Sequence, residues 1–338
     1  MHYVVLGAGA AGIAALRAIH REEPSAKLTC ITTEPAPFYF RPMLVELFAR
    51  SAFNHDAGKV PIGLEAVDWH FGARVMTIAP KENVVKLATG EAITYDFLII
   101  ATGSKADLSF VEPFREVVNV LHSYSDLIRL KKNLQFGEVL VIGGGYVAIE
   151  IIRQLHNRGN SVTYFARPDY FWPREVPGVT ASDIEQILTG VAVPPQFDNE
   201  VVDVVDWNGT QYSVIDKKGQ RHMVDVILAI PVETPNIGLL KGSGIRCEEG
   251  VIVNEELRTN IPNIFAAGDC AQVLDLKHQI NRVNFGWRSA EKQGELAGQN
   301  AVGKNVVYVP SSQDFYFLDL LGKSLLDRWA GPEQSINS

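Results

Sequence analysis

The sequence predicts an α/β fold that contains two copies of one βαβ unit, each with a glycine-rich turn between its first strand and its helix. The first copy has an apolar strand at 4–6, a turn at 7–12 and helical apolar spacing at 13–19. A second strand follows at 28–31. This order of elements is typical of a Rossmann-like, dinucleotide-binding domain.

The second copy begins with an apolar strand at 139–142 and continues through Gly143-Gly144-Gly145 into a helix at 146–155. It ends in a strand at 162–165. No low-complexity linker separates the two copies. We therefore expect two interleaved domains.

Three further apolar strands are predicted, and each stops at a turn. They are 97–101, which stops at Thr102-Gly103, 224–230, which stops at Pro231, and a strand from 263 that stops at Gly268-Asp269. The predicted division is one domain from 1–109 and 240–305, a second from 110–239, and a short C-terminal segment at 306–338.

Composition excludes several classes of function. The 338 residues carry a net charge of -8 without a cluster of Lys and Arg, so we expect no nucleic-acid partner. No signal peptide or membrane-spanning apolar run is visible, which favours a cytoplasmic protein. Cys30, Cys247 and Cys270 form no CxxC pair, and the eight histidines show no metal-like spacing. We therefore expect no metal site.

The first turn has the spacing GxGxxG at Gly7, Gly9 and Gly12. The first glycine allows the tight turn, the second lets a pyrophosphate approach the backbone, and the third lets helix and strand pack closely. The helix that follows offers free N–H groups to the phosphates. An acid that binds the ribose belongs near the end of the second strand, where Glu34 is the candidate. A solvent-facing loop carboxylate is the alternative for Glu34.

The second turn has Gly143 and Gly145, with Ala148 at the third position. The strand-end position of a ribose acid is occupied by Ala166, and Arg167 follows. A guanidinium there suits the 2′-phosphate of NADPH, whereas an acid would favour NADH. The pattern leans slightly towards NADPH, and a surface charge is the alternative for Arg167.

Four motifs in this order resemble the pyridine nucleotide-disulfide oxidoreductases, flavoproteins with two dinucleotide-binding domains. The motifs are the first turn, 98–104, the second turn through Glu150, and 259–269, and the resemblance covers roughly 1–305. It implies a glutathione-reductase-like pair of domains that bind FAD and NADH or NADPH. It also implies that Asp269 contacts the ribityl or pyrophosphate part of FAD at the start of a following helix, that Val75 contacts adenine through its backbone, and that Thr102 and Gly103 lie beside FAD where the chain changes domain.

Two stretches are similar to the rubredoxin, ferredoxin and nitrite-reductase-type reductases. The segment 38–44 looks like their YxRPxL motif, and Trp287 begins a WxxAxxQGxxAG pattern that would place this helix start near the isoalloxazine. Arg41 is a candidate partner for a flavin phosphate or carbonyl, with a surface salt bridge as the alternative.

With the resemblance, the candidate residues form two sets. Those for FAD are Gly7, Gly9, Ala10, Ala11, Gly12, Glu34, Arg41, Pro42, Val75, Ala101, Thr102, Gly103, Gly268, Asp269 and Trp287. Those for the nicotinamide nucleotide are Gly143, Gly145, Tyr146, Val147, Glu150, Arg167 and Ile230.

This sequence departs from the family in four ways. Residues 38–50 contain no Cys, so thiolate chemistry beside the flavin is not expected. Glu46 occupies a position where some relatives have Lys, and we expect it to approach Glu150, with a raised pKa for one of them. The segment 231–236 lacks the usual glycine, and the usual C-terminal interface domain is much longer than 306–338.

The expected function is an FAD-dependent NAD(P)H oxidoreductase in which the flavin carries the chemistry. No side chain is a certain catalytic group, although Glu46, Glu150 and Tyr146 are expected near the flavin and nicotinamide. The electron acceptor is a rubredoxin-like or ferredoxin-like protein, or oxygen. One alternative is a quinone reductase on the membrane surface through the apolar stretch 315–329, although the acidic residues there favour a remnant interface domain or a homodimer contact instead. The other is a sensor or electron-transfer subunit with little turnover.

Overall fold

A computed structural model of the chain describes residues 1–35, 39, 41, 44–49, 60–61, 63–134, 137–168, 180–275 and 280–310. These residues divide into two units. The described residues up to 39, from 60 to 105 and from 234 onward form unit 1, and those from 41 to 49 and from 106 to 233 form unit 2.

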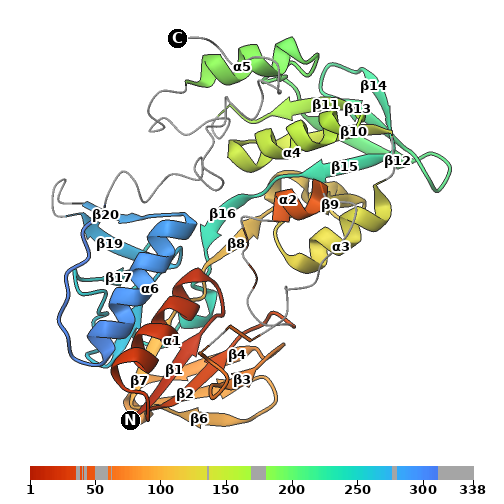
Figure 1. Cartoon of the computed structure of the whole chain (residues 1–338). Coiled ribbons are helices and arrows are strands. Elements are labelled where there is room, and N and C mark those ends of the chain that lie inside the picture. The colour runs from red at the N-terminus through yellow and green to blue at the C-terminus, as the bar shows by residue number, and fades with distance from the viewer. Residues whose placement is uncertain are drawn as a thin grey trace. The chain divides into compact units, whose positions relative to one another are not determined.

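Unit 1 is centred on a five-stranded parallel sheet in the order β18-β7-β1-β2-β3. Its inner strands, β18, β7 and β1, are short, mainly apolar and mostly buried, whereas the edge strand β3 is not buried. Helices α1 and α6 lie side by side in Figure 1. The bounds are β1 (His2–Leu6), α1 (Ala10–Glu22), β2 (Lys27–Ile31), β3 (Asp68–His70), β7 (Phe97–Ile100), β18 (Ile264–Ala266) and α6 (Trp287–Ala301).

Two small sheets and two 3-10 turns complete the described part of unit 1. One sheet is antiparallel in the order β4-β5-β6, and the other has the order β17-β19-β20. The bounds are β4 (Val75–Ala79), η2 (Pro80–Glu82), β5 (Val84–Leu87), β6 (Ala92–Thr94), η4 (Gly238–Leu240), β17 (Val251–Val253), β19 (Ala271–Asp275) and β20 (Ile280–Val283).

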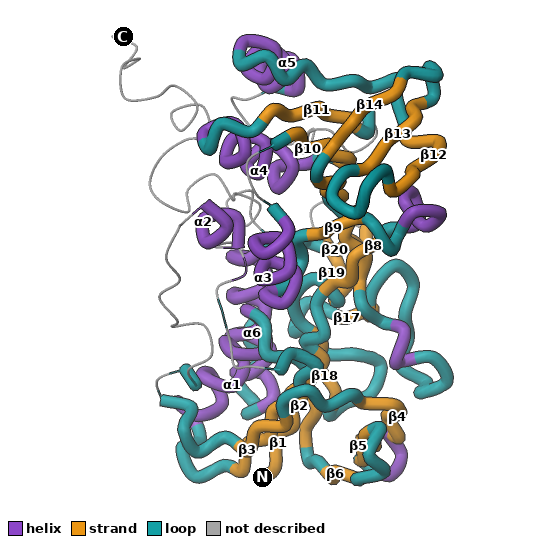
Figure 2. The backbone as a smooth tube through the Cα atoms, turned by 90° about the vertical axis from the view of Figure 1, so that its right-hand side faces the viewer, coloured by secondary structure: helices purple, strands orange, loops and turns teal. Residues whose placement is uncertain are grey.

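Unit 2 repeats this plan around a four-stranded parallel sheet in the order β11-β10-β15-β9. Figure 2 shows α4 on one side of β10 and β11, with the antiparallel sheet of β12, β13 and β14 on the other. The bounds are α2 (Leu44–Ala49), η3 (Ser109–Phe114), β9 (Val118–Val120), α3 (Tyr124–Asn133), β10 (Glu138–Gly143), α4 (Gly145–Asn157), β11 (Ser161–Ala166), α5 (Ala181–Gly190), β12 (Val201–Asp206), β13 (Tyr212–Asp216), β14 (Arg221–Val224) and β15 (Val226–Ala229).

The chain passes between the units along β8 (Ser104–Asp107) and β16 (Val232–Pro235), which pair with each other. These crossings lie within a few residues of the expected boundaries at 109 and 240. Helix α2 differs from expectation, because it groups with unit 2 rather than with the first domain. The Arg158 guanidinium donates to the carbonyl of Phe48 at 2.9 Å and lies over the Phe48 ring, which ties α2 to α4.

The strand predicted at 224–230 is two strands that belong to different sheets. β14 ends at Val224 and β15 starts at Val226. Between them, the Asp225 amide donates to the Glu138 carbonyl at 2.8 Å, and an Asp225 carboxylate oxygen accepts from the Glu138 amide at 2.8 Å. These two bonds redirect the chain from the antiparallel sheet into the parallel one.

Candidate functional site

Strand register gathers the candidate residues of unit 1 at one edge of the parallel sheet. Leu6 pairs with Ile31 and Ile100, and Ala266 pairs with Ile100. The segments after these strands contain the glycine turn, Glu34, Thr102-Gly103 and Gly268-Asp269. In a parallel α/β sheet, ligands bind outside the carboxyl ends of the strands. All four predicted segments therefore lie at the carboxyl edge of the parallel sheet, where a ligand is expected.

The three glycines of the first turn meet different surroundings. A Cβ atom on Gly7 would lie 2.1 Å from the Ala101 carbonyl oxygen, and one on Gly12 would lie 1.9 Å from the Gly7 carbonyl oxygen. A Cβ on Gly9 would meet nothing within 4 Å. Gly7 and Gly12 thus serve the packing of the turn, while the backbone at Gly9 faces open space. That space suits a phosphate held against the backbone.

The start of α1 is equally suited to an anion. Gly9 is its N-cap without a side-chain cap, and its first turn carries no acidic residue. By contrast, Ser123 and Thr180 cap α3 and α5 through complete capping boxes with Asp126 and Asp183. Uncapped N–H groups leave the partial positive charge of a helix end for a ligand phosphate. The residues at 7–12 therefore fit the pyrophosphate of FAD.

Glu34 lies three residues past the end of β2, and the Tyr39 hydroxyl donates to its carboxylate at 3.2 Å. The Glu34 carbonyl accepts from the Gly72 amide at 2.9 Å, and the Thr32 carbonyl accepts from the Ala73 amide at 2.8 Å. These bonds hold the loop before Val75, the first residue of β4, beside the loop that carries Glu34.

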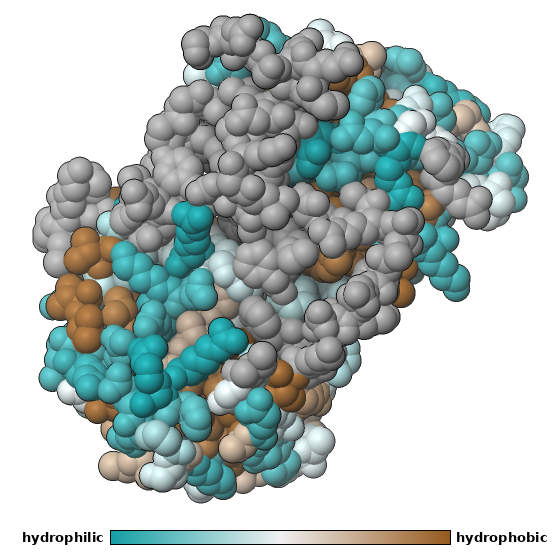
Figure 3. All heavy atoms as spheres, in the orientation of Figure 1, coloured by the Kyte–Doolittle hydropathy of each residue, from teal (hydrophilic) through white to brown (hydrophobic). Residues whose placement is uncertain are grey.

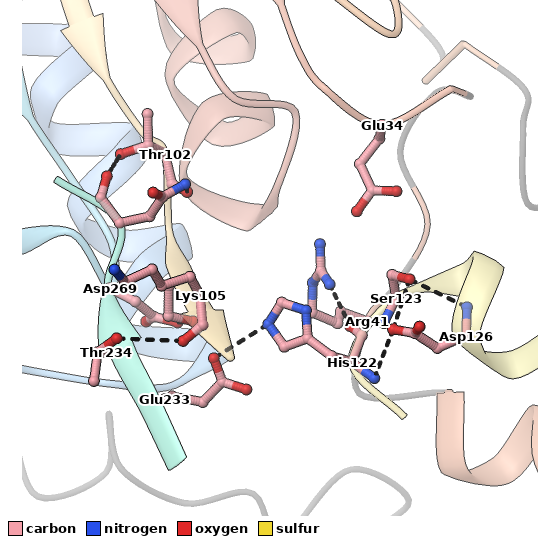
Figure 4. Close-up of polar contacts among 12 residues, drawn as sticks. Glu34, Arg41, Thr102, Lys105, His122, Ser123, Asp126, Glu233, Thr234 and Asp269 are labelled. Carbon is pink, nitrogen blue, oxygen red and sulfur yellow. Dashed lines mark hydrogen bonds and ion pairs between the residues drawn. The ribbon is translucent and has the colours of Figure 1, made fainter. Parts of the chain in front are cut away.

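A cluster of hydrogen bonds fixes the turn after β7. The Thr102 hydroxyl donates to the Asn236 carbonyl at 2.8 Å, and the Asn236 amide donates to the Gly103 carbonyl at 2.9 Å. Figure 4 shows the Thr102 bond and the nearby bond from the Thr234 hydroxyl to the Lys105 carbonyl at 3.5 Å. Asn236 was not among the predicted site residues, although it lies in the segment 231–236, which lacks the usual glycine of the family.

Asp269 lies at the start of helix α6, which is not the element that directly follows it in the sequence. Strands β19 and β20 follow it, and the helix that it meets is α6. One Asp269 carboxylate oxygen accepts from the amide of Gly286, the N-cap of α6, at 3.2 Å, and the other accepts from the Ser104 hydroxyl at 3.4 Å. The carboxylate is thereby held at the edge that carries the glycine turn.

The small residues of the predicted WxxAxxQGxxAG pattern pack α6 against α1. A Cβ on Gly294 would lie 2.0 Å from the Ala11 carbonyl oxygen, and one on Gly298 would lie 2.6 Å from that of Ala15. Gln293 is fully buried and accepts from the Gly268 amide at 3.0 Å. Ala11 is itself buried, so a ligand would meet its backbone rather than its methyl group.

Unit 2 repeats the geometry of unit 1 with different residues. Gly143 pairs with Ala166 and Ile142 pairs with Ala229, which brings the glycine turn, Arg167 and Ile230 to one edge. A Cβ on Gly143 would lie 2.5 Å from the Ile230 carbonyl oxygen, much as one on Gly7 would lie 2.1 Å from that of Ala101. Helix α4 also lacks a side-chain cap and a first-turn acid. Val147 in that turn is 40% exposed.

Arg167 follows β11 directly, and its guanidinium lies over the Phe110 ring at 5.2 Å from the centroid. Its amide donates to the Gly143 carbonyl at 3.0 Å, which fixes it beside the glycine turn. A stacked guanidinium loses less freedom when it binds a phosphate.

Two of the candidate residues, Glu150 and Arg41, lie in unit 2. Glu150 is bonded to the Arg153 guanidinium at 2.8 Å, one turn along α4. The side chain of Glu46 is not described, so its expected approach to Glu150 stays a prediction. The Tyr146 side chain, Pro42 and the segment 311–338 also lie outside the described part of the chain. Arg41 donates to the His122 carbonyl within unit 2, and His122 in turn lies 3.2 Å from the Glu233 carboxylate (Figure 4).

The three cysteines are free thiols. Cys30 and Cys270 are fully buried, and burial raises the pKa of both thiols. Burial also raises the pKa of Cys247, which is partly buried. None has the lowered pKa of a redox-active thiolate.

A family model described as pyridine nucleotide-disulphide oxidoreductase matches residues 1–294. The chain belongs to this family. An NADH-rubredoxin oxidoreductase of Clostridium acetobutylicum is 27% identical over 314 residues, 90% of this chain and 76% of the relative. A ferredoxin reductase structure from Rhodopseudomonas palustris has a TM-score of 0.80 and 20% identity over 91% of this chain and 77% of its own.

An engineered water-forming NADPH oxidase bound to NADPH has the same fold, with a TM-score of 0.80 and 23% identity. The match covers 91% of this chain and 71% of that one. These comparisons confirm the pair of Rossmann-like domains and the expected class. The chain is an FAD-dependent oxidoreductase that uses NADH or NADPH. Its activity is electron transfer.

Among the described helices, none combines the length and apolar character needed to cross a bilayer. The face drawn in Figure 3 is mainly hydrophilic over the described residues, with scattered apolar side chains.

Proposed function

We propose that unit 1 binds FAD, that unit 2 binds NADPH, and that electrons leave the flavin for a small redox protein. The main support for assigning one nucleotide to each unit comes from helices α1 and α4. Each follows a glycine turn at the carboxyl edge of its sheet, and neither has a side-chain cap. FAD, when bound, accepts a hydride from the nicotinamide and passes electrons on. The protein supplies binding and orientation.

In unit 1, the N–H groups after Gly9 would bind the pyrophosphate and Glu34 the ribose hydroxyls. The bonded set of Thr102, Asn236 and Gly103 would hold the chain beside the cofactor. Asp269 would orient the ribityl chain while its other contacts keep α6 in place. None of these groups needs to change its protonation during turnover.

The acceptor is proposed from chemistry and from likeness. Because burial raises the pKa of each thiol, no cysteine offers a thiolate relay, and electrons would leave the flavin directly. The similar proteins are named for rubredoxin and ferredoxin, which are small electron carriers. Oxygen is a second candidate, favoured by the likeness to a water-forming oxidase.

Anaerobic stopped-flow absorbance tests the first half of the proposal. The yellow protein mixed with NADPH should lose its flavin absorbance rapidly, and rubredoxin or ferredoxin added afterwards should restore it. Restoration by oxygen alone, at a rate that redox proteins do not exceed, would assign the protein as an oxidase. A flavin that neither NADPH nor NADH bleaches would contradict the proposal.

The preference for NADPH rests on Ala166-Arg167 at the end of β11. The engineered NADPH oxidase carries changes that include the replacement of an adjacent Asp-Ala pair by Ala-Arg. Arg167→Ala should lower kcat/KM for NADPH by roughly 10–100-fold, since a charge-assisted hydrogen bond contributes about 1.5–3 kcal/mol. The value for NADH should stay constant.

Arg221→Ala is the matched control, because this arginine also lies over an aromatic ring, Trp207, but on the antiparallel sheet of unit 2. Arg221→Ala should change kcat/KM for neither NADPH nor NADH. Ala166→Glu should shift the preference towards NADH. Equal kinetics with both nucleotides in the wild type and in all three variants would refute the assignment of Arg167.

A further inference from the structure

The Phe110 ring supports a positive charge on one of its faces. The central carbon of the Arg167 guanidinium lies over the ring, 5.2 Å from its centroid. Both residues belong to unit 2, but they come from different elements: Phe110 lies in η3, and Arg167 directly follows β11. The position of the guanidinium is therefore set by tertiary packing and not by its own strand.

The ring itself is held in place by the core of unit 2. Val111, the next residue of η3, is fully buried in a core cluster that includes residues of β10, and Phe110 is partly buried against the same cluster. The start of η3 is closed by the Ser109 amide, which donates to the Asp107 carboxylate at 3.0 Å. A ring anchored in this way offers a fixed surface to the side chain above it.

The other end of Arg167 is fixed at the second glycine turn. The Arg167 amide donates to the Gly143 carbonyl at 3.0 Å, and the Tyr164 hydroxyl donates to the same carbonyl at 3.2 Å. The backbone of Arg167 is thus held at the turn, and its guanidinium is held over the ring of Phe110. An arginine that is ordered before its ligand arrives loses less conformational entropy on binding.

An aromatic ring is a suitable support for a phosphate-binding arginine. The attraction between a cation and the face of a ring consumes none of the N–H donors of the guanidinium. A carboxylate in the same place would accept hydrogen bonds from those donors and would neutralise the charge. The ring therefore positions the charge without competing with a phosphate for it.

We propose that Phe110 is a positioning residue for the choice of nucleotide, which holds the Arg167 guanidinium where it meets the 2′-phosphate of NADPH. This rests on the proposed binding of NADPH by unit 2. Phe110 touches no reacting atom and acts through Arg167. NADH has no 2′-phosphate, so it gains nothing from the ring. The contribution of Phe110 therefore appears as a difference between the two nucleotides.

Isothermal titration calorimetry of the FAD-loaded protein with NADP⁺ and with NAD⁺ tests this role. Phe110→Leu keeps an apolar side chain against the core but removes the ring face. It should raise the Kd for NADP⁺ by about 3–10-fold, the range of a cation–π contact, and leave the Kd for NAD⁺ unchanged. The KM for NADPH should rise with it, while kcat at saturating NADPH stays constant. Phe110→Tyr restores the ring face and should bind both nucleotides like the wild type.

A double variant and a matched control sharpen the test. Phe110→Leu combined with Arg167→Ala should bind NADP⁺ no more weakly than Arg167→Ala alone, because the ring acts only through the guanidinium. Trp207→Leu is the control, since this ring also lies under an arginine, Arg221, at 5.9 Å. The control should change neither Kd.

Two outcomes would overturn the inference alone. One is an equal loss of affinity for NADP⁺ and NAD⁺ in Phe110→Leu, which would make the ring a general packing residue. The other is a wild-type Kd for NADP⁺ in Phe110→Leu when Arg167→Ala binds NADP⁺ weakly. A wild-type Kd for NADP⁺ in Arg167→Ala would overturn the proposed role of Arg167 as well.

Discussion

Among single residues, Asp216 shows how a buried carboxylate stabilises unit 2. One of its oxygens lies 2.7 Å from Asn199 Nδ2 and 2.8 Å from His222 Nε2, and the other accepts from the amides of Lys218 and Gln220. Burial acts to raise the pKa of Asp216, but the bonds from His222, Asn199 and the Gln220 amide outweigh it and lower the pKa to about 2. The ionised form closes the turn between β13 and β14.

A lowered pKa in the folded state makes the contribution of Asp216 depend on pH. It is fully present above the ordinary value of 3.8 and is lost as the pH falls through about 2. Asp216→Asn should reduce the free energy of unfolding by about 1–3 kcal/mol at pH 7, and the difference should shrink below pH 4. Urea unfolding at pH 7 and below pH 4 measures the difference in the free energy of unfolding. The exposed Asp198→Asn should change stability by less than about 0.5 kcal/mol, and an equal loss in both variants would contradict the role of Asp216.

For the helices, the contact between α1 and α6 determines whether the first glycine turn keeps its shape. In Gly294→Ala the new methyl group would lie 2.0 Å from the Ala11 carbonyl oxygen, which is backbone and cannot move aside. We expect a loss of about 1–3 kcal/mol in stability together with weaker retention of FAD, because α1 carries the turn. Calorimetry and the ratio of FAD to protein measure the two effects.

Gly190→Ala is the control for Gly294→Ala, because Gly190 also lies in a helix but a Cβ there would meet nothing within 4 Å. This change should be neutral or should stabilise the protein by roughly 0.5–1 kcal/mol. Wild-type stability of Gly294→Ala would show that α1 and α6 can separate without cost.

The same elements show what could be predicted from sequence. Strands β1, β2, β10 and β11 and the helices between them follow from apolar periodicity and from glycine turns, because these signals are local. The pairing of Asp269 with Gly286 depends on two intervening strands, and the grouping of α2 with α4 depends on Arg158, 110 residues from Phe48. Contacts of this kind arise from tertiary packing.

For the whole molecule, we expect the two units to bind different ligands. A ligand that binds only the folded form stabilises the region that it contacts, in proportion to the logarithm of its concentration over its Kd. If FAD belongs to unit 1 and the nucleotide to unit 2, the two ligands should slow amide exchange in different segments. Neither effect requires a change in the other unit.

Hydrogen exchange of the apoprotein with each ligand added alone tests this division. FAD should protect the amides of 9–13, 101–104 and 268–269, where the glycine turn, the Thr102 cluster and Asp269 share one edge. NADP⁺ should protect 144–149 and 166–167 at the corresponding edge of unit 2. The hairpin of β13 and β14 serves as the internal control, because it lies away from both glycine turns in sequence and should exchange equally in every sample. If both ligands protected the same unit, the second glycine turn would be a structural repeat rather than a second binding site.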